Sequence, residues 1–311
     1  MEFNLVAINV AIMVAYTIPG FILLKTKAIK ESAIPAFTKV LMYVCQPCLS
    51  IYTFQKVTYT KELAINMLIF FSLSIAFQVA MLLLMRLIYI KKYNESFKYK
   101  VAVVAPILGN VGFFGIPLLE NLLPNNPEAL AYGAVFIIAF NLIAWTLGAF
   151  FLTGDKAYIS GKKAFLNPPV LTLFITLPLF FTKTLLPDII LNSVTILGKM
   201  TTPLCMIIVG MRLATAKFKD LFTSPLTYLS SIIKLIIFPL LAYLFVFFLP
   251  IDNIMKITMF IVCCTPTASV VLSITEIAQL GGQKDAAYSL MMSTIFCLIT
   301  IPTLLLLTQF I

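Results

Sequence analysis

The chain has 311 residues, of which 61% are hydrophobic and 11% are charged. An average soluble domain has about a quarter charged residues, so this chain has too few polar side chains to cover a water-facing surface. The composition therefore excludes a soluble fold and predicts a protein embedded in lipid. Its apolar runs are long and continuous, which indicates membrane-spanning helices and not the short alternating strands of a β-barrel.

Residue usage excludes several further classes. The sequence has no histidine, the commonest general base and metal ligand, so neither an enzyme nor a metal site is expected. Cys45 and Cys48 form a CxxC pair without a second ligand pair, and they are interpreted as packing residues one helical turn apart. The net charge of +10 lies in short loops between apolar runs, which is not typical of a nucleic-acid binder. No cofactor is expected.

Ten apolar stretches are long enough to span a bilayer. The first has no basic region or small-residue cleavage site before it, so it is interpreted as a span and not as a cleaved signal. The sixth is short and rich in proline. The predicted spans are residues 4–24, 33–54, 63–90, 99–121, 129–152, 168–186, 192–213, 223–249, 254–279 and 284–309.

Counting basic residues loop by loop predicts the orientation. With the N-terminus outside, the inside loops hold 15 of the 22 basic residues: Lys25, Lys27, Lys30, Arg86, Lys91, Lys92, Lys98, Lys100, Lys156, Lys162, Lys163, Arg212, Lys217, Lys219 and Lys284. The outside loops hold Lys56, Lys61, Lys183 and Lys256, and the spans hold Lys39, Lys199 and Lys234. Because Lys and Arg gather on the cytoplasmic side, we expect a cytoplasmic-membrane protein with both termini outside.

The longest loop, near residues 153–167, divides the chain into two units, 1–155 and 156–311, of five spans each. An odd number of spans makes the second unit insert upside down relative to the first. Such inverted repeats are typical of secondary transporters. A shift of 156 residues pairs Pro47 with Pro203 and Glu120 with Glu276, although overall identity at this shift is barely above chance.

Spans four and nine each contain a segment that disfavours a continuous helix. The run Gly109-Asn110-Val111-Gly112-Phe113-Phe114-Gly115-Ile116-Pro117 holds three of the 12 glycines and a proline. Span nine holds Thr265-Pro266-Thr267-Ala268-Ser269 at the corresponding place. Glycine and proline both weaken a helix, so each span is predicted to break there, the alternative being a simple kink. Paired broken helices indicate a transporter site at mid-membrane.

Two half-helices that begin at one point would aim partial positive charge and unpaired N–H groups at it, which suits a small anion. The candidate substrate-binding residues are Gln46, Asn110, Gly112, Pro117, Asn141, Thr265, Pro266, Thr267 and Ser269. Candidate hinge or gating residues are Pro47, Gly109, Gly115 and Pro203. Glu276 and Lys199 are candidates for coupling to protons or sodium, with an interfacial position as the alternative for each.

At these motifs the chain resembles the auxin efflux carrier family, which includes plant PIN-type carriers and bacterial malonate or malate permeases. The resemblance covers nearly the whole chain. It rests on Gln46-Pro47-Cys48-Leu49, Gly109 to Phe113, Gly115 to Leu118, Asn167-Pro168-Pro169, Pro203-Leu204, Gly210 to Leu213, Thr265 to Ser269 and Gly281-Gly282.

The resemblance implies ten helices in two inverted five-helix repeats, with helices four and nine broken and crossed. It also implies a scaffold part, a transport part and elevator-like movement of an organic anion. The crossover asparagine and prolines of the family map onto Asn110, Pro117 and Pro266, although span nine has no asparagine beside its proline. A homodimer is plausible for such a carrier.

The leading hypothesis is thus a permease for a small organic anion such as a carboxylate. The alternative is a sodium-coupled symporter with the fold of the bile-acid transporters, whose ion sites Glu276 and Gln279 match only loosely. A receptor is not expected, because no loop is long enough to form a ligand-binding or signalling domain.

Overall fold

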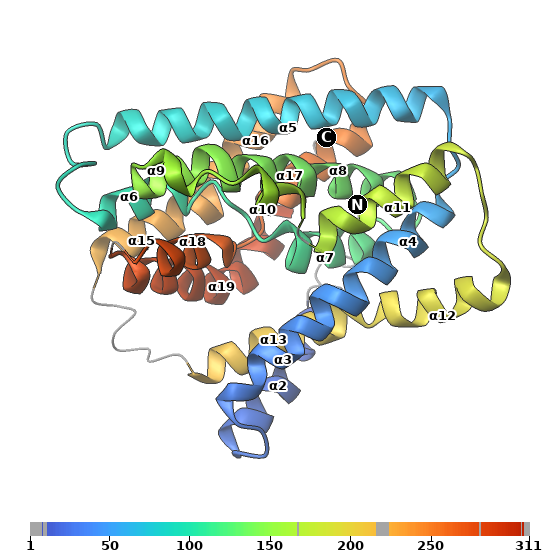
Figure 1. Ribbon diagram of the computed structural model, residues 1–311, viewed down its shortest axis with the longest axis horizontal. Coiled ribbons are helices and arrows are strands. Elements are labelled where there is room, and N and C mark those ends of the chain that lie inside the picture. The colour runs from blue at the N-terminus through green and yellow to red at the C-terminus, as the bar shows by residue number, and fades with distance from the viewer. Residues whose placement is uncertain are drawn as a thin grey trace.

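The computed structural model describes residues 8, 11–166, 168–215, 224–279, 281–305 and 307, and within them the regular elements are all helices (Figure 1). Asn167, which belongs to a motif of the resemblance, lies outside the described residues. The same is true of Lys217 and Lys219 from the count of basic residues.

Six helices among the described residues are long and apolar enough to cross a membrane: Glu31–Lys56, Lys61–Ile88, Pro127–Thr153, Asp188–Thr215, Pro225–Phe247 and Gln283–Leu305. Lys156–Phe165 and Val170–Phe181, bent by 40°, make a seventh if they form one span. Shorter apolar helices cover Ala11–Lys25, Val111–Leu122 and Asn253–Cys263. A multi-pass helical membrane protein is therefore confirmed, while the count of ten spans and the inverted repeat stay predictions.

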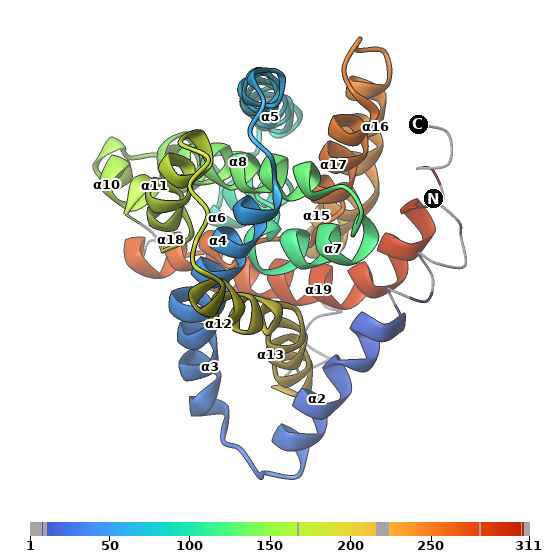
Figure 2. The ribbon, with the colours of Figure 1, turned by 90° about the vertical axis from the view of Figure 1, so that its right-hand side faces the viewer.

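The elements fall into two groups. One group, called the panel here, packs α2 against α13 and packs α4 against both α11 and α12 (Figures 1 and 2). The panel comprises α2 (Thr17–Lys25), η1 (Glu31–Ala33), α3 (Ile34–Val40), η2 (Leu41–Cys45), α4 (Gln46–Lys56), α11 (Pro168–Phe181), α12 (Asp188–Lys199) and α13 (Thr201–Thr215).

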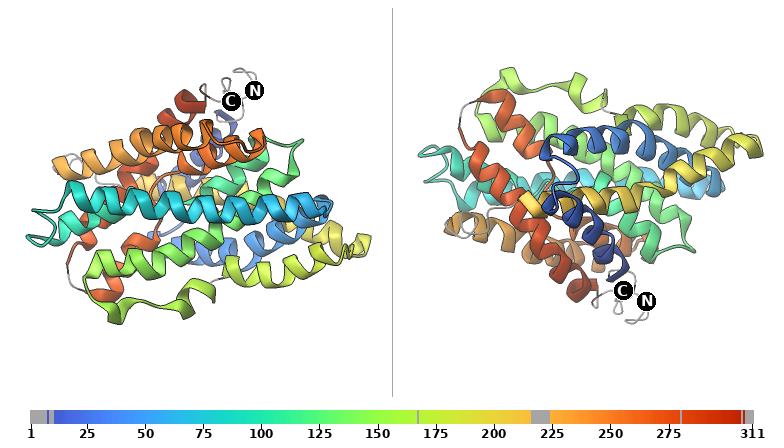
Figure 3. Two further views of the ribbon diagram at one scale, coloured as in Figure 1. Left: turned by 90° about the horizontal axis from the view of Figure 1, so that it is seen from above. Right: turned by 90° about the horizontal axis from the view of Figure 1, so that it is seen from below.

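The other group, called the bundle, holds the remaining elements. Its α5, α8 and α16 run roughly parallel along the long axis of the molecule (Figure 3). From the first half it contains α5 (Lys61–Ile88), α6 (Phe97–Val104), η3 (Val111–Gly115), α7 (Ile116–Leu122), α8 (Pro127–Ile143), η4 (Ala144–Gly148) and α9 (Ala149–Thr153). From the second it contains η5 (Lys156–Tyr158), α10 (Gly161–Phe165), α15 (Pro225–Ile232), η6 (Ile233–Ile237), α16 (Phe238–Phe247), α17 (Asn253–Cys263), α18 (Val270–Ala278) and α19 (Gln283–Leu305).

Two glycines allow the panel helices α2 and α13 to pack closely. A Cβ atom added to Gly20 would lie 2.0 Å from the carbonyl oxygen of Ile207, and one added to Gly210 would lie 1.9 Å from that of Thr17. Lipid tails are as apolar as leucine, so membrane helices associate mainly through such close backbone packing. The pair α2–α13 therefore depends on these two missing side chains.

Among the described residues, π-helical turns interrupt three long helices, at η2, η4 and η6, and a fourth, η3, begins the helix Val111–Leu122. Three of them are followed by a proline, namely Pro47, Pro117 and Pro239, at the second position of the next α-helix. Proline has no N–H and its ring clashes with the carbonyl one turn earlier, so the preceding turn widens. Wide turns of this kind are frequent at functional sites, and residues of all four lie close to the crossing described next.

Candidate functional site

Two non-helical segments cross between the broken helices. Residues 105–110 separate α6 from η3, and residues 264–269 separate α17 from α18. Gly109 and Thr267 pair as an isolated antiparallel bridge. The N–H of Asn110 donates to Pro266 O at 2.7 Å, and the N–H of Ala268 donates to Leu108 O at 2.7 Å. Each segment thus supplies hydrogen-bond partners for backbone groups of the other. Without this pairing, these N–H and C=O groups would be unsatisfied at membrane depth.

Thr267 holds the crossing from within, because it is 1% exposed and all its bonds are to other segments. Its hydroxyl donates to Ala105 O at 3.2 Å, the carbonyl that follows α6. Its N–H donates to the hydroxyl of Ser293 on α19 at 3.0 Å. Thr265 instead bonds back to the helix before it, because its hydroxyl donates to Val262 O of α17 at 2.7 Å. Both threonines therefore shape the crossing and do not face a ligand.

The break in the fourth predicted span differs in position from the one expected. It lies at residues 105–110, before most of the glycine motif, while residues 111–122 are helical. Pro117 stands at the second position of α7, directly after the π-helical turn η3, and the helix continues past it to Leu122. The glycines permit close approach instead: a Cβ on Gly112 would lie 3.3 Å from Gln46 Nε2, and one on Gly115 would lie 3.2 Å from Thr265 Cγ2.

Two half-helices begin at the crossing, at η3 and at α18. Asn110 caps η3, because its Oδ1 accepts from the N–H of Phe113 at 3.3 Å. The N–H groups of Gly112 and Val270 have no hydrogen-bond acceptor among the described residues. Both residues line the same cavity. Unpaired N–H groups at helix starts carry partial positive charge, so this cavity suits an electron-rich ligand.

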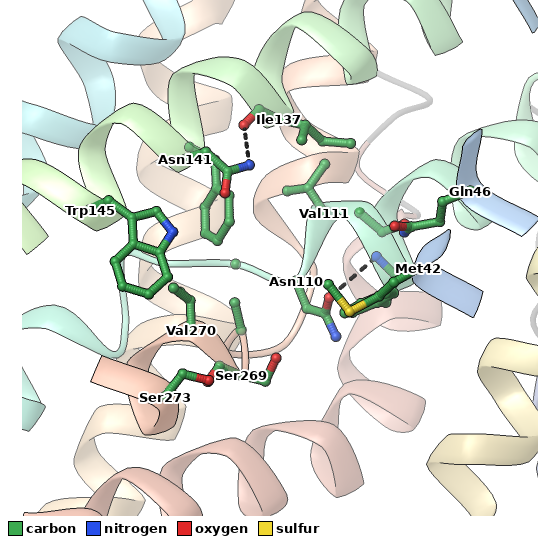
Figure 4. A pocket seen from close by; sticks show the side chains of 15 residues that line it. Met42, Gln46, Asn110, Val111, Ile137, Asn141, Trp145, Ser269, Val270 and Ser273 are labelled. Atoms are coloured by element: carbon green, nitrogen blue, oxygen red, sulfur yellow. Dashed lines mark hydrogen bonds between the residues drawn. The ribbon is translucent and has the colours of Figure 1, made fainter. Parts of the chain in front are cut away.

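This cavity, called the main cavity here because it lies at the crossing, has a volume of about 170 Å³ and lies between the panel and the bundle. Its lining combines small and apolar side chains with a few amides and hydroxyls, and none of the lining residues is charged (Figure 4). The lining residues are Met42, Gln46, Gly109, Asn110, Val111, Gly112, Phe113, Ile137, Phe140, Asn141, Trp145, Ala268, Ser269, Val270 and Ser273.

The polar side chains of the cavity keep hydrogen-bonding capacity free. Asn141 uses its Nδ2 to bond Ile137 O at 2.8 Å, which leaves its Oδ1 available. Asn110 uses its Oδ1 for the cap, and its side-chain nitrogen points toward Ser269 (Figure 4). The Oε1 atom of Gln46 is buried and has no partner among the described residues. A ligand with both donor and acceptor groups could satisfy these atoms together.

The panel is attached to η3 by hydrogen bonds to carbonyls in the turn that precedes Pro117. As a proline, residue 117 offers no N–H to the carbonyls of Gly112 and Phe113, its usual partners in a π- or α-helical turn. Gln46 Nε2 from α4 donates to Gly112 O at 2.6 Å. The thiol of Cys205 from α13 donates to Phe113 O. In the π register, where the N–H of Ile116 bonds Val111 O, Pro117 leaves the carbonyl of Gly112 without a helical partner. That carbonyl and the next one, of Phe113, therefore each bond a panel helix.

Among the described residues, two further cavities are lined by predicted site residues. One, of about 60 Å³, shares Asn110 and Ser269 with the main cavity and is also lined by Pro266 and Arg212. The other, of about 360 Å³, is lined by Glu120, Lys199 and Pro203 and is separate from the crossing.

Six predicted site residues line the main cavity: Gln46, Gly109, Asn110, Gly112, Asn141 and Ser269. The structure places the others elsewhere. Thr265, Pro266 and Thr267 lie in the crossing itself, and Gly115 is the last residue of η3, packed close to Thr265. Pro47 and Pro117 lie in the first turns of helices, and Pro203 and Lys199 line the separate cavity. Glu276 is exposed on α18, where its charge interacts with that of Arg212, and it does not line the main cavity.

Three lining residues that the sequence analysis missed lie one helical turn from predicted ones. Met42 precedes Gln46 by four residues, Trp145 follows Asn141 by four, and Ser273 follows Ser269 by four. Residues four apart share a helix face, so this spacing was an available signal. Lys234, also missed, lies fully buried behind Gly109.

Comparison with known proteins identifies the family. The sequence profile of the family described as membrane transport protein matches residues 5–162 and 157–305, nearly the whole chain. No curated protein matches the sequence significantly.

A multi-pass helical protein with two broken, crossed helices beside a mostly apolar cavity that carries a few polar groups has the features of a membrane transporter. The profile match agrees with this class. The chain belongs to the membrane transport protein family, that of the auxin efflux carriers, so the family predicted from the motifs is confirmed.

Proposed function

We propose that this protein is a secondary carrier for a small organic anion, such as a mono- or dicarboxylate, which binds in the cavity at the crossing. The observation that carries the proposal is the meeting of two half-helix starts there, with the unpaired N–H groups of Gly112 and Val270 on its wall. Backbone N–H groups at helix starts bind carboxylates without any charged side chain. The amides of Asn110 and Asn141 and the hydroxyl of Ser269 would orient the bound anion.

An elevator-like movement is the mechanism that the arrangement supports best. Met42 and Gln46 of the panel form one wall of the cavity, while the crossing, η3, α8–η4 and α18 of the bundle form the rest. A shift of the bundle past the panel would therefore open the cavity first to one side of the membrane and then to the other. The ten-span, inverted-repeat topology in the cytoplasmic membrane, with both termini outside, belongs to this proposal.

Sodium coupling is less well supported by the side chains present. Sodium and other hard cations are bound by carboxylate and carbonyl oxygens. The main cavity has no carboxylate in its lining, and Glu276 lies outside it. The described residues contain no group of three or more His, Cys, Asp or Glu side chains that could hold a metal ion.

Binding can be tested on the purified protein in detergent by measuring thermal unfolding in the presence of a panel of carboxylates. The panel would contain malonate, malate and indole acetate, with malonamide as the uncharged match for malonate. A ligand that binds only the folded state raises the midpoint of unfolding. At least one carboxylate should raise it while malonamide does not. Equal midpoints with every carboxylate would refute the proposed cargo.

A further inference from the structure

Lys234 is a fully buried charged residue that the proposed mechanism has not used. It lies in η6, in the middle of the membrane-spanning helix Pro225–Phe247, and it is 0% exposed. Its ammonium donates one long hydrogen bond, to Cys263 O at 3.4 Å, and lies 4.3 Å from the ring centre of Phe238. Among the described residues, no Asp or Glu forms an ion pair with it.

A buried ammonium with so few partners is expensive, because a charge removed from water needs an opposite charge or several hydrogen bonds. Lysines near a helix end avoid the problem by extending to the membrane surface. Lys234 does not, since its whole side chain is buried. Ionisable groups kept at membrane depth in this way usually serve a function.

The ammonium reaches the crossing through the space left by a missing side chain. A Cβ added to Gly109 would lie 2.8 Å from Lys234 Nζ and 2.6 Å from Thr265 Oγ1. Gly109 also lines the main cavity. The backbone of one glycine therefore touches both the buried cation and the proposed anion site.

We propose that Lys234 is a selectivity-determining residue, whose buried ammonium makes the otherwise uncharged cavity positive and so favours anions. It acts as a positioning charge across Gly109 and does not touch the ligand. Salt and water screen buried charges weakly, so a charge at this depth acts on the whole cavity. The proposal rests on the proposed anion carrier and names the residue that supplies its charge preference.

The two halves of the chain differ at this point. The shift that pairs Pro47 with Pro203 also pairs Lys234 with Gln78. Gln78 is likewise 0% exposed, and it bonds Ser74 O on its own helix at 3.0 Å. An uncharged amide is therefore compatible with a buried position of this kind, which makes Lys234→Gln the natural variant for removing the charge while keeping a donor.

The competing explanation is purely structural. Cys263 is the last residue of α17, and a cation beside the last carbonyls of a helix stabilises that helix end. Two other cations lie near the site: Arg212 lines the smaller cavity, and Lys163 lies 5.1 Å from the ring centre of Trp145. A test must therefore distinguish an effect of the Lys234 charge on the cavity from helix capping by Lys234 and from the charges of Arg212 and Lys163.

Trp145 supplies that test, because it is the one tryptophan of the sequence and it lines the cavity. Its fluorescence would be quenched with iodide, with caesium and with uncharged acrylamide at constant ionic strength. A positive cavity concentrates iodide and excludes caesium. In the wild type, iodide should therefore quench Trp145 more strongly than caesium relative to acrylamide, and equal quenching or a preference for caesium would overturn the proposal.

Variants of Lys234 then test whether the positive potential of the cavity comes from this residue. In Lys234→Gln and Lys234→Met the iodide-to-acrylamide ratio should fall by about threefold or more, as expected for removing a weakly screened charge. Lys234→Arg should restore it, and Lys163→Met should leave most of it in place. A structural cap alone would lower the unfolding midpoint in Lys234→Met without changing the ratio. An unchanged ratio in folded Lys234→Gln, or a ratio abolished by Arg212→Met alone, would overturn the assignment.

Iodide is not the proposed cargo, so the two proposals can fail separately. If no carboxylate stabilises the wild type but iodide quenching depends on Lys234, then the cargo is wrong and the charge assignment stands. If malonate binds the wild type and Lys234→Gln equally, and the quenching ratio is also unchanged, then the carrier proposal stands and Lys234 has no role in selectivity.

Discussion

The side-chain amide of Gln46 donates to the backbone carbonyl of Gly112 at 2.6 Å, and this bond joins the panel to the broken helix of the bundle. Gln46 is 5% exposed and lines the proposed anion site. The bond exists because Pro117 leaves the carbonyl of Gly112 without an N–H partner. Gln46 and Gly112 therefore both attach the panel to the bundle and line the proposed anion site. A shift of the bundle past the panel has to break the hydrogen bond between them.

We expect Gln46→Met to change transport more than stability. A neutral hydrogen bond contributes about 1 kcal/mol, so its loss should alter apparent affinity or rate by roughly fivefold. Initial rates of labelled malonate uptake into proteoliposomes would measure this. Gln55→Met is the matched control, because Gln55 bonds Thr184 O and Leu186 N away from the site. Equal kinetics in both variants would refute a role for the Gln46 bond.

Pro117→Ala should weaken the same attachment from the other side. The new N–H of residue 117 would compete with Gln46 and Cys205 for the carbonyls of Gly112 and Phe113. We therefore expect reduced malonate uptake in a protein that still folds, because alanine favours the helix. Uptake at the wild-type rate would show that the free carbonyls do not matter. Pro124→Ala, in the loop after α7, is a control without this competition.

Gly109→Ala should destabilise the crossing. The added methyl would lie 2.6 Å from Thr265 Oγ1 and 2.8 Å from Nζ of Lys234, which is fully buried. Overpacking of this kind costs about 1–3 kcal/mol. The midpoint of thermal unfolding should fall, whereas Gly161→Ala should leave it nearly unchanged because nothing lies within 4 Å of the added atom. Equal midpoints would show that the crossing adapts to the methyl group.

Gly210→Ala should be more damaging than Gly109→Ala. The added methyl would meet a backbone carbonyl, Thr17 O, at 1.9 Å, and no side-chain rotation can relieve that contact. The helices α2 and α13 would have to separate, so a loss above about 3 kcal/mol is expected. Thermal unfolding of the two variants side by side measures the difference. A smaller loss in Gly210→Ala would mean that the close packing of the panel contributes little.

The sequence allowed the helical class, the family and the two broken helices to be predicted, because hydrophobic length and clustered Gly and Pro are local signals. It did not give the position of the first break. Glycines at 109, 112 and 115 serve close approach as well as breaking, and Pro117 is tolerated in a first helical turn. Whether a given glycine or proline breaks the helix or permits close packing depends on neighbouring residues that are distant in the sequence.

The role of Lys234 could not be predicted either. A lysine in an apolar run can extend to the membrane surface or stay buried, and the choice depends on packing against Gly109, Cys263 and Phe238. Glu276 shows the opposite outcome, since an acidic residue near membrane depth is exposed at the end of α18. Burial of single charges is set by tertiary contacts and not by local composition.

In the proposed mechanism, an organic anion crosses the membrane by binding at the crossing. Counterflow of labelled malonate into proteoliposomes loaded with unlabelled malonate, without sodium, tests it most directly in wild type and in Asn110→Ala. Asn110 caps η3 and points its amide into the cavity (Figure 4). We expect sodium-independent counterflow in the wild type and roughly tenfold less in Asn110→Ala, from loss of the cap and of a ligand contact. Counterflow that strictly requires sodium, or that proceeds equally in folded Asn110→Ala, would contradict it.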